Sequence, residues 1–211
     1  MNSLPPRAEA LMIDGPAGRL EALLEQPLAS PAAFGVICHP HPLYGGSMQN
    51  KVVHTLARAC QERGMPTLRF NFRGVGASAG SYDEGRGETQ DALAVIAAGR
   101  ARWPHAALTL AGFSFGAVVS LMAAAAAAPS RLISVAPAVV RFGLTSMARP
   151  ACPWLIVQGD ADELVDALEV QAFAAQFSPP PQLVLLAGVG HFFHGRLDQL
   201  RDAAIAFLDA T

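Results

Sequence analysis

Residues 107–117, Ala-Leu-Thr-Leu-Ala-Gly-Phe-Ser-Phe-Gly-Ala, decide the fold of this 211-residue chain. The first five predict a strand, and the alanine-rich run that begins at Ala117 predicts a helix. Ser114 stands at the sharp turn between them, and its flanking residues Gly112 and Gly116 are small enough for the turn to close. Such a turn lifts the hydroxyl above the edge of the sheet and directs the first amides of the helix towards its target. Ser114 is therefore a candidate nucleophile. The alternative is a helix start at which the serine only caps free amides.

Length and composition restrict the class of protein. We expect 211 residues to form a single domain, 1–211. A hydrophobic content of 52% with 15% charged residues indicates a sheet covered on both faces. The formal net charge of −2, without any basic run, gives no support for binding to nucleic acid or to an anionic membrane. We therefore expect a small-molecule substrate and no nucleic-acid partner. Nothing in the sequence indicates the oligomeric state.

Three other features bear on location and redox state. Residues 1–7 lack the apolar core of a secretory signal, so we expect a cytoplasmic protein. Cys38, Cys60 and Cys152 are odd in number and lie in apolar segments, which favours reduced, buried thiols over disulfides. The most apolar window, 113–128, is rich in alanine, which contributes little to membrane insertion. It predicts a buried helix rather than a membrane span.

Strand and helix patterns alternate along the rest of the chain. Residues 8–13 and 19–25 flank a turn signal at 14–18 and predict an antiparallel hairpin. Further strands are predicted at 34–38, 67–72, 107–111, 132–136, 154–157 and 183–186, with helices starting near 51, 90, 117, 166 and 197. This alternation predicts an α/β fold. We expect a mostly parallel sheet of about eight strands with an N-terminal antiparallel hairpin and helices on both faces.

A serine hydroxyl is a poor nucleophile, so Ser114 needs a base within hydrogen-bond reach and a group that holds the base. Residues 158–162, Gln-Gly-Asp-Ala-Asp, begin at the end of one predicted strand and supply carboxylates. Residues 188–191, Gly-Val-Gly-His, follow the last predicted strand and supply an imidazole. Parallel sheets place their ligand sites at these carboxyl ends of strands. The sequence therefore predicts that serine, acid and histidine converge there.

Together these segments resemble the α/β-hydrolase superfamily over nearly the whole chain. The segments Cys-His-Pro-His-Pro at 38–42, Tyr-Gly-Gly-Ser-Met at 44–48 and Asn-Phe-Arg-Gly-Val-Gly at 71–76 further resemble small bacterial serine hydrolases without a lid. That group includes esterases and dienelactone-hydrolase-like proteins. The resemblance implies a hydrolase with Ser114 as nucleophile, Asp162 as orienting acid and His191 as base. It implies no cofactor and no metal.

The resemblance also separates neighbouring candidates. The family's pattern of a glycine, two residues and then an acid fits Asp162, and leaves Asp160 as a turn residue and Asp166 as a helix cap. His191 directly follows the glycines after the last strand, whereas His194 lies nearer the closing helix. We therefore expect His194 to be structural or peripheral.

An oxyanion needs two N–H donors. The superfamily takes one from the residue after the nucleophile, here Phe115, and one from a loop whose place is occupied by the His-Pro-His-Pro segment at 39–42. Because neither proline has an N–H, the amide of His41, or one from Leu43 onward, is the expected second donor. As an alternative, the two imidazoles of this segment and a carboxylate could hold a metal ion.

The glycine-rich segment 71–80 nearly matches a dinucleotide-binding fingerprint. However, the next helical pattern starts only after Gly87, and no acidic strand end follows at the required spacing. We expect this segment to brace the site, with Arg73 in a structural ion pair.

The connection between the strands that end near Ala136 and begin near Trp154 is too short for a cap domain. We expect an open acyl cleft that favours short or unhindered acyl esters. Its expected substrate-binding residues are Tyr44, Phe113, Val139 and Phe142. The sequence thus predicts a carboxylic ester hydrolase with an acyl-enzyme on Ser114. Thioester or lactone hydrolysis, or a non-catalytic binding protein on a hydrolase scaffold, remain alternatives.

Overall fold

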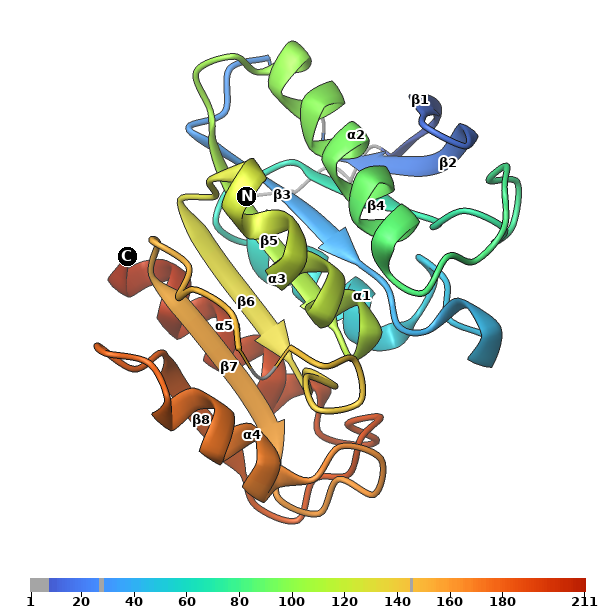
Figure 1. Cartoon of the computed structure of the whole chain (residues 1–211). Coiled ribbons are helices and arrows are strands. Elements are labelled where there is room, and N and C mark those ends of the chain that lie inside the picture. Colours follow the sequence, from blue (N-terminus) through green and yellow to red (C-terminus); the bar gives the residue numbers. More distant parts are fainter. Residues whose placement is uncertain (1–7, 27–28, 145) are drawn as a thin grey trace.

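The computed structural model describes residues 8–26, 29–144 and 146–211. Residues 1–7, on which the expected cytoplasmic location rests, lie outside this range. Within it the chain forms eight strands, five α-helices and one short 3-10 helix, η1 (Pro42–Tyr44) (Figure 1). The helices lie on both sides of a twisted sheet (Figure 1).

The eight strands form one sheet in the order β1-β2-β4-β3-β5-β6-β7-β8. They are β1 (Ala8–Gly15), β2 (Gly18–Glu25), β3 (Ala33–Cys38), β4 (Thr67–Phe70), β5 (Ala107–Phe113), β6 (Arg131–Val135), β7 (Trp154–Gly159) and β8 (Gln182–Leu186). The pairs β1–β2 and β2–β4 are antiparallel, and all other pairs are parallel. The predicted fold, a mostly parallel sheet with an N-terminal hairpin, is confirmed.

Side-chain caps define where two of the helices begin. The helices are α1 (Lys51–Gln61), α2 (Arg86–Arg102), α3 (Phe115–Ala127), α4 (Ala167–Ala175) and α5 (Leu197–Ala210). At the start of α1, Asn50 Oδ1 accepts from Val52 N at 2.8 Å, and at the start of α4, Asp166 Oδ1 accepts from Leu168 N at 2.8 Å. Each side chain satisfies an amide that has no partner within its helix. The predicted cap at Asp166 is confirmed.

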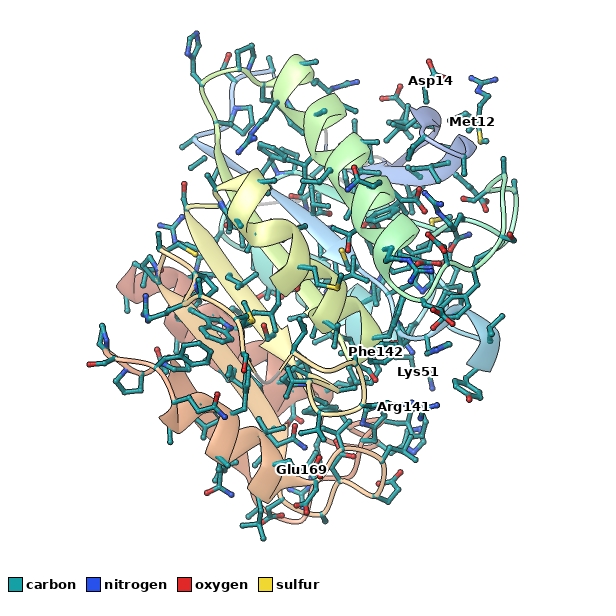
Figure 2. All side chains as sticks on the ribbon, in the orientation of Figure 1. Met12, Asp14, Lys51, Arg141, Phe142 and Glu169 are labelled. Atoms are coloured by element: carbon teal, nitrogen blue, oxygen red, sulfur yellow. The ribbon has the colours of Figure 1, made fainter. Side chains whose placement is uncertain are left out.

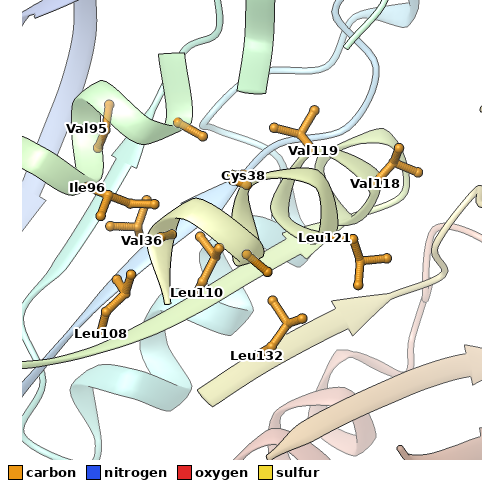
Figure 3. Packing of buried hydrophobic residues seen from close by; sticks show 14 of the residues in the cluster. Val36, Cys38, Val95, Ile96, Leu108, Leu110, Val118, Val119, Leu121 and Leu132 are labelled. Carbon is orange, nitrogen blue, oxygen red and sulfur yellow. The ribbon is translucent and has the colours of Figure 1, made fainter. Parts of the chain in front are cut away.

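Consecutive residues of the central strands enter two different cores. Val36 and Leu110 belong to the core under α2, α3 and α4, whereas their neighbours Ile37 and Ala111 belong to the core under α1 and α5. Figure 3 shows the first of these cores, in which strand residues meet side chains of α2 and α3. Successive side chains of a strand point to opposite faces. Because both faces are covered, the central strands consist almost entirely of buried residues.

The alanine-rich helix α3 is a buried element, as predicted. Ten of its thirteen residues are buried, including Ala117, Ala123 and Ala124. Short side chains let its axis lie close to the sheet. Within the described part of the chain, no helix is long and apolar enough to cross a membrane.

Three further features also match the sequence analysis. Cys38, Cys60 and Cys152 are buried and free, and burial raises the pKa of the Cys60 thiol to about 12. The Arg73 guanidinium pairs with the fully buried carboxylate of Asp91 at 2.7 Å, which ties the glycine-rich loop to α2. Between β6 and β7, the described residues form turns and bends without a helix or strand. No cap domain is present among the described residues.

Candidate active site

Ser114 occupies a strained turn between β5 and α3. Its φ of 54° and ψ of −115° lie outside the regions that residues other than glycine favour. Such a backbone costs about 1–3 kcal/mol and persists only where its surroundings hold it. Here Ser114 N donates to Val135 O at 2.8 Å, so the neighbouring strand β6 holds the turn in place.

Glycines on both sides of Ser114 let the turn close. A Cβ atom added at Gly112 would lie 2.1 Å from Gly116 O, and one added at Gly116 would lie 2.3 Å from Cys38 O. Both contacts are far too short, and both involve backbone atoms that cannot move aside. The structure therefore accounts for the small residues at these two positions.

Three side chains from distant parts of the sequence form one hydrogen-bonded relay. His191 Nε2 lies 3.1 Å from Ser114 Oγ, and His191 Nδ1 lies 2.8 Å from Asp162 Oδ2 and 3.1 Å from Asp162 Oδ1. Ser114 follows β5, Asp162 follows β7, and His191 follows β8. With its proton on Nδ1, the imidazole donates to Asp162 and accepts from the Ser114 hydroxyl. The structure thus brings the three predicted residues together in the geometry that nucleophile activation requires.

Asp162 is held in its ionised form by three further contacts besides the imidazole's two bonds. Its Oδ1 accepts from Leu164 N at 2.9 Å and Val165 N at 2.8 Å, and its Oδ2 accepts from Gln158 Nε2 at 3.0 Å. Burial alone would raise the pKa of Asp162, but the hydrogen bonds from His191 and from the two amides lower it below its ordinary value. A carboxylate that stays ionised can stabilise the imidazolium that forms during catalysis.

Gln158 is a residue that the sequence analysis did not single out. It is fully buried on β7, and its Nε2 also lies 3.1 Å from both Gly159 O and Val165 O. The side chain therefore links the carboxylate of Asp162 to the loop that carries it. No sequence signal revealed this role, because a single glutamine in an apolar strand has no characteristic spacing.

The neighbouring acids and histidines serve other purposes. Asp160 Oδ1 accepts from Gly188 N at 2.6 Å and joins two loops, in agreement with the expected turn role. Glu163 Oε2 accepts from His191 N at 3.1 Å and holds the backbone of the histidine. The ring of His194 stacks on Phe192, with centroids 5.8 Å apart.

The oxyanion-hole amides are candidates by position. His41 and Phe115 line the same pocket as Ser114. Among the described residues, neither backbone N–H donates to a protein acceptor. His41 O accepts from Tyr44 N and Gly46 N, both at 3.1 Å, and these bonds fix the loop. Because these two amides belong to pocket-lining residues and have no protein acceptor among the described residues, they remain the candidates for binding an oxyanion.

His39 anchors this loop from below. It is fully buried, its Nε2 accepts from Phe72 N at 3.0 Å, and its Nδ1 lies 2.6 Å from Pro40 O. Burial lowers its pKa to about 4, although the bond to Pro40 acts in the opposite direction. Both ring nitrogens are therefore occupied by backbone groups. The described residues contain no group of three histidine, cysteine or acidic side chains that could hold a metal ion.

Ser114 and His191 open into a pocket of about 320 Å³. The pocket is lined by Pro40, His41, Tyr44, Gly45, Gly46, Asn50, Ser114, Phe115, Ala138, Arg141, Phe142, Leu164, Val165, His191 and Phe192. Tyr44 and Phe142, two of the expected substrate-binding residues, are among them. The ring of His41 lies within 6.0 Å of the rings of Tyr44, Tyr82, Phe115 and Phe142, measured between centroids. An aromatic wall therefore borders the pocket on the side of the 39–46 loop.

Two expected substrate-binding residues, Phe113 and Val139, do not line this pocket. Phe113 is fully buried under the ring of His191, with centroids 5.0 Å apart, and packs on Phe193. Val139 is buried in the core on the α3 side. Both predictions are corrected for the same reason: the two side chains are buried in the protein interior, and their neighbours Ser114 and Ala138 line the pocket instead.

Comparisons with known proteins agree with this architecture. Residues 14–149 match the family model of the X-Pro dipeptidyl-peptidase (S15) family. An α/β serine hydrolase homologue from Coxiella burnetii is 49% identical, with a TM-score of 0.90 over 95% of this chain and 97% of its own. An α/β serine hydrolase without lid from Xanthomonas campestris is 44% identical, with a TM-score of 0.91 over 100% of this chain and 97% of its own. An uncharacterized protein from Rickettsia prowazekii (strain Madrid E) is 31% identical over 208 residues, which cover 94% of this chain and 87% of that protein.

Proposed function

Because this chain belongs to the X-Pro dipeptidyl-peptidase (S15) family and has the α/β serine hydrolase fold, we propose that it hydrolyses carboxylic esters through an acyl-enzyme on Ser114. The observation that carries the proposal is the relay from Ser114 through His191 to Asp162, with bonds of 3.1 and 2.8 Å. Each group has the neighbour that its chemical role requires.

In the proposed reaction, His191 Nε2 takes the proton of the Ser114 hydroxyl as the oxygen attacks the ester carbonyl. The amides of His41 and Phe115 stabilise the oxyanion. When the tetrahedral intermediate collapses, the C–O bond to the alcohol breaks and the imidazolium gives its proton to the leaving oxygen. Water then attacks the acyl-enzyme with His191 again as base, which releases the acid and restores Ser114.

The pocket supports an ester rather than an N-terminal peptide as substrate. An enzyme that releases an X-Pro dipeptide must bind a free α-ammonium group, which requires a carboxylate or several acceptors in the site. Within the described residues, the pocket lining contains no aspartate or glutamate, and it includes the cationic residue Arg141. A cationic group would therefore meet repulsion where it needs an acceptor. Peptidase activity of the S15 type is the second candidate, favoured by the family match alone.

The absence of a cap among the described residues, together with a pocket of about 320 Å³, supports short or unhindered acyl groups. Rates on an ester series of increasing acyl length should pass through a maximum at short chains. Rates that rise steadily to long acyl chains would contradict this preference.

One set of measurements tests the proposed function. A fluorophosphonate should label wild-type protein at Ser114 with one label per chain, and the Ser114→Ala variant should remain unlabelled. The labelled residue is then identified by mass spectrometry. Steady-state rates on a 4-nitrophenyl ester, a thioester, a lactone and an X-Pro 4-nitroanilide separate the reaction classes. Folded protein that takes no label would support a binding protein, and turnover of the anilide alone would support a peptidase.

A further inference from the structure

Arg141 is an exposed cation on the edge of the proposed catalytic pocket. It lies on the connection between β6 and β7 and lines the pocket together with Ser114 and His191. Figure 2 shows Arg141 and Phe142 at the end of the molecule where this connection lies. The mechanism proposed above gives Arg141 no task.

The charge of Arg141 is not balanced by the pocket. Among the described residues, the ionisable groups that line the pocket are the imidazoles of His41 and His191, the phenol of Tyr44 and the guanidinium-bearing side chain of Arg141. The lining that these described residues form therefore contains no carboxylate that could balance the charge of Arg141. No carboxylate in the part of the chain that the structure describes forms an ion pair with it. Glu169 shares only a separate, shallow hollow of about 30 Å³ with Arg141. A fixed cation in a largely apolar wall attracts an anionic ligand.

The guanidinium is held in place without being neutralised. Arg141 Nη2 donates to Tyr44 Oη at 3.1 Å, and its Cζ lies 5.5 Å from the centroid of the Tyr44 ring. The Tyr44 ring lies 4.7 Å from the ring of His41, whose pKa is lowered by burial and by the charge of Arg141. A guanidinium has five N–H donors, and this arrangement uses one of them. The others can form the paired hydrogen bonds that a carboxylate accepts.

The position of Arg141 indicates which part of the ester it contacts. The leaving alcohol must lie against His191 Nε2, which protonates it. Arg141 instead contacts Tyr44, on the loop that carries the amide of His41. It therefore lies beside the oxyanion loop, and the acyl group is assigned to this side of the pocket, with the leaving alcohol at the imidazole.

We propose that Arg141 is a specificity-determining residue that binds a carboxylate at the far end of the acyl group, so that the preferred substrates are half-esters of dicarboxylic acids. This inference rests on the proposed ester hydrolysis and adds the substrate class. The paired hydrogen bonds from Arg141 hold the acyl chain without taking part in bond breaking. Their loss should therefore raise KM and leave kcat nearly unchanged.

The test compares two esters that differ only in the terminal group, mono(4-nitrophenyl) adipate and 4-nitrophenyl hexanoate, followed by release of 4-nitrophenolate. In Arg141→Gln, kcat/KM for the adipate should fall about tenfold through KM, because a hydrogen bond to a charged group contributes about this factor. The value for the hexanoate should change less than about twofold. The charge reversal Arg141→Glu should lower the adipate value further and favour 4-nitrophenyl 6-aminohexanoate instead.

Arg201→Gln is the matched control, because Arg201 lies on α5 and pairs with its neighbour Asp202 at 2.9 Å. It should leave both esters unaffected. Equal losses on both esters in Arg141→Gln, or no loss on either, would overturn the inference while ester hydrolysis itself stands. If wild-type protein hydrolyses neither ester, the proposed function fails first. Circular dichroism confirms that each variant is folded.

Discussion

His39 should make the stability of this protein fall as the pH is lowered from 7.5 to 5. The side chain is fully buried and its Nε2 accepts from Phe72 N, so a proton on Nε2 would replace an acceptor by a second donor. Burial lowers the pKa of His39 from 6.5 to about 4. Between these two values the unfolded chain binds a proton that the folded protein does not bind, and stability is therefore lost as the pH falls.

The size of this effect follows from the two pKa values. From pH 7.5 to pH 5 the free energy of unfolding should fall by about 2 kcal/mol, and the loss should approach about 3 kcal/mol near and below pH 4. Other groups titrate in the same range, so the measured quantity is a difference between variants. Urea unfolding of wild type and of His39→Gln at pH 7.5 and pH 5, followed by circular dichroism, isolates the contribution of this histidine.

We expect the pH-dependent loss in His39→Gln to be smaller than in wild type by about 2 kcal/mol, whatever the stability of the variant at pH 7.5. His105→Gln removes an exposed histidine on the turn before β5 and should show the wild-type loss. If His39→Gln and wild type lose the same stability, His39 is not kept neutral and our reasoning is wrong. A wild-type NMR titration in which the His39 ring is protonated between pH 6 and 7 would lead to the same conclusion, without a variant.

Three other substitutions test the turn and the relay. The Ser114→Gly variant should lose hydrolysis because it lacks the nucleophile. In urea unfolding it should be more stable than Ser114→Ala by about 1 kcal/mol, because glycine tolerates the positive φ at this position. Equal stabilities of the two variants would show that the turn is unstrained. The free energy of unfolding of Gly116→Ala should be lower than that of wild type by at least about 2 kcal/mol, since the added Cβ would lie 2.3 Å from Cys38 O. A melting temperature equal to that of wild type would contradict this close contact. Gln158→Leu should lower kcat about tenfold at unchanged KM, because one hydrogen bond to Asp162 is lost. An unchanged kcat would show that Gln158 supports the fold but not the relay.

Much of the fold could be predicted because the strands are buried on both faces and therefore appear as apolar runs in the sequence. The strand predicted at 34–38 is observed at Ala33–Cys38. The strand predicted at 67–72 ends at Phe70, because Asn71 turns out of the sheet and its side chain accepts from Met48 N at 2.8 Å. Such a hydrogen bond across 23 residues has no local sequence signal.

The relay residues could be predicted because each one follows a strand of a parallel sheet, where the positions of strand ends are linked to the order of the chain. The pocket could not be predicted in the same way. Phe113 and Phe115 lie on the two sides of Ser114 and are chemically identical, yet Phe113 packs on Phe193 in one core while Phe115 lines the pocket. Which of the two residues borders the pocket depends on the turn at Ser114, and that turn has no counterpart in the sequence pattern of the rings themselves. The position of Arg141 at the pocket likewise depends on the path of a loop without regular secondary structure.

The arrangement of the relay also determines when activity arises during synthesis. Ser114 precedes His191 by 77 residues, and His191 follows β8, the strand at the edge of the sheet. A ribosome needs on the order of ten seconds to translate such a stretch. During that time the growing chain carries the serine and then the acid, but no base that could activate the hydroxyl. The proposed hydrolysis therefore cannot begin until the last strand and the histidine after it have been made, so translation itself delays the chemistry.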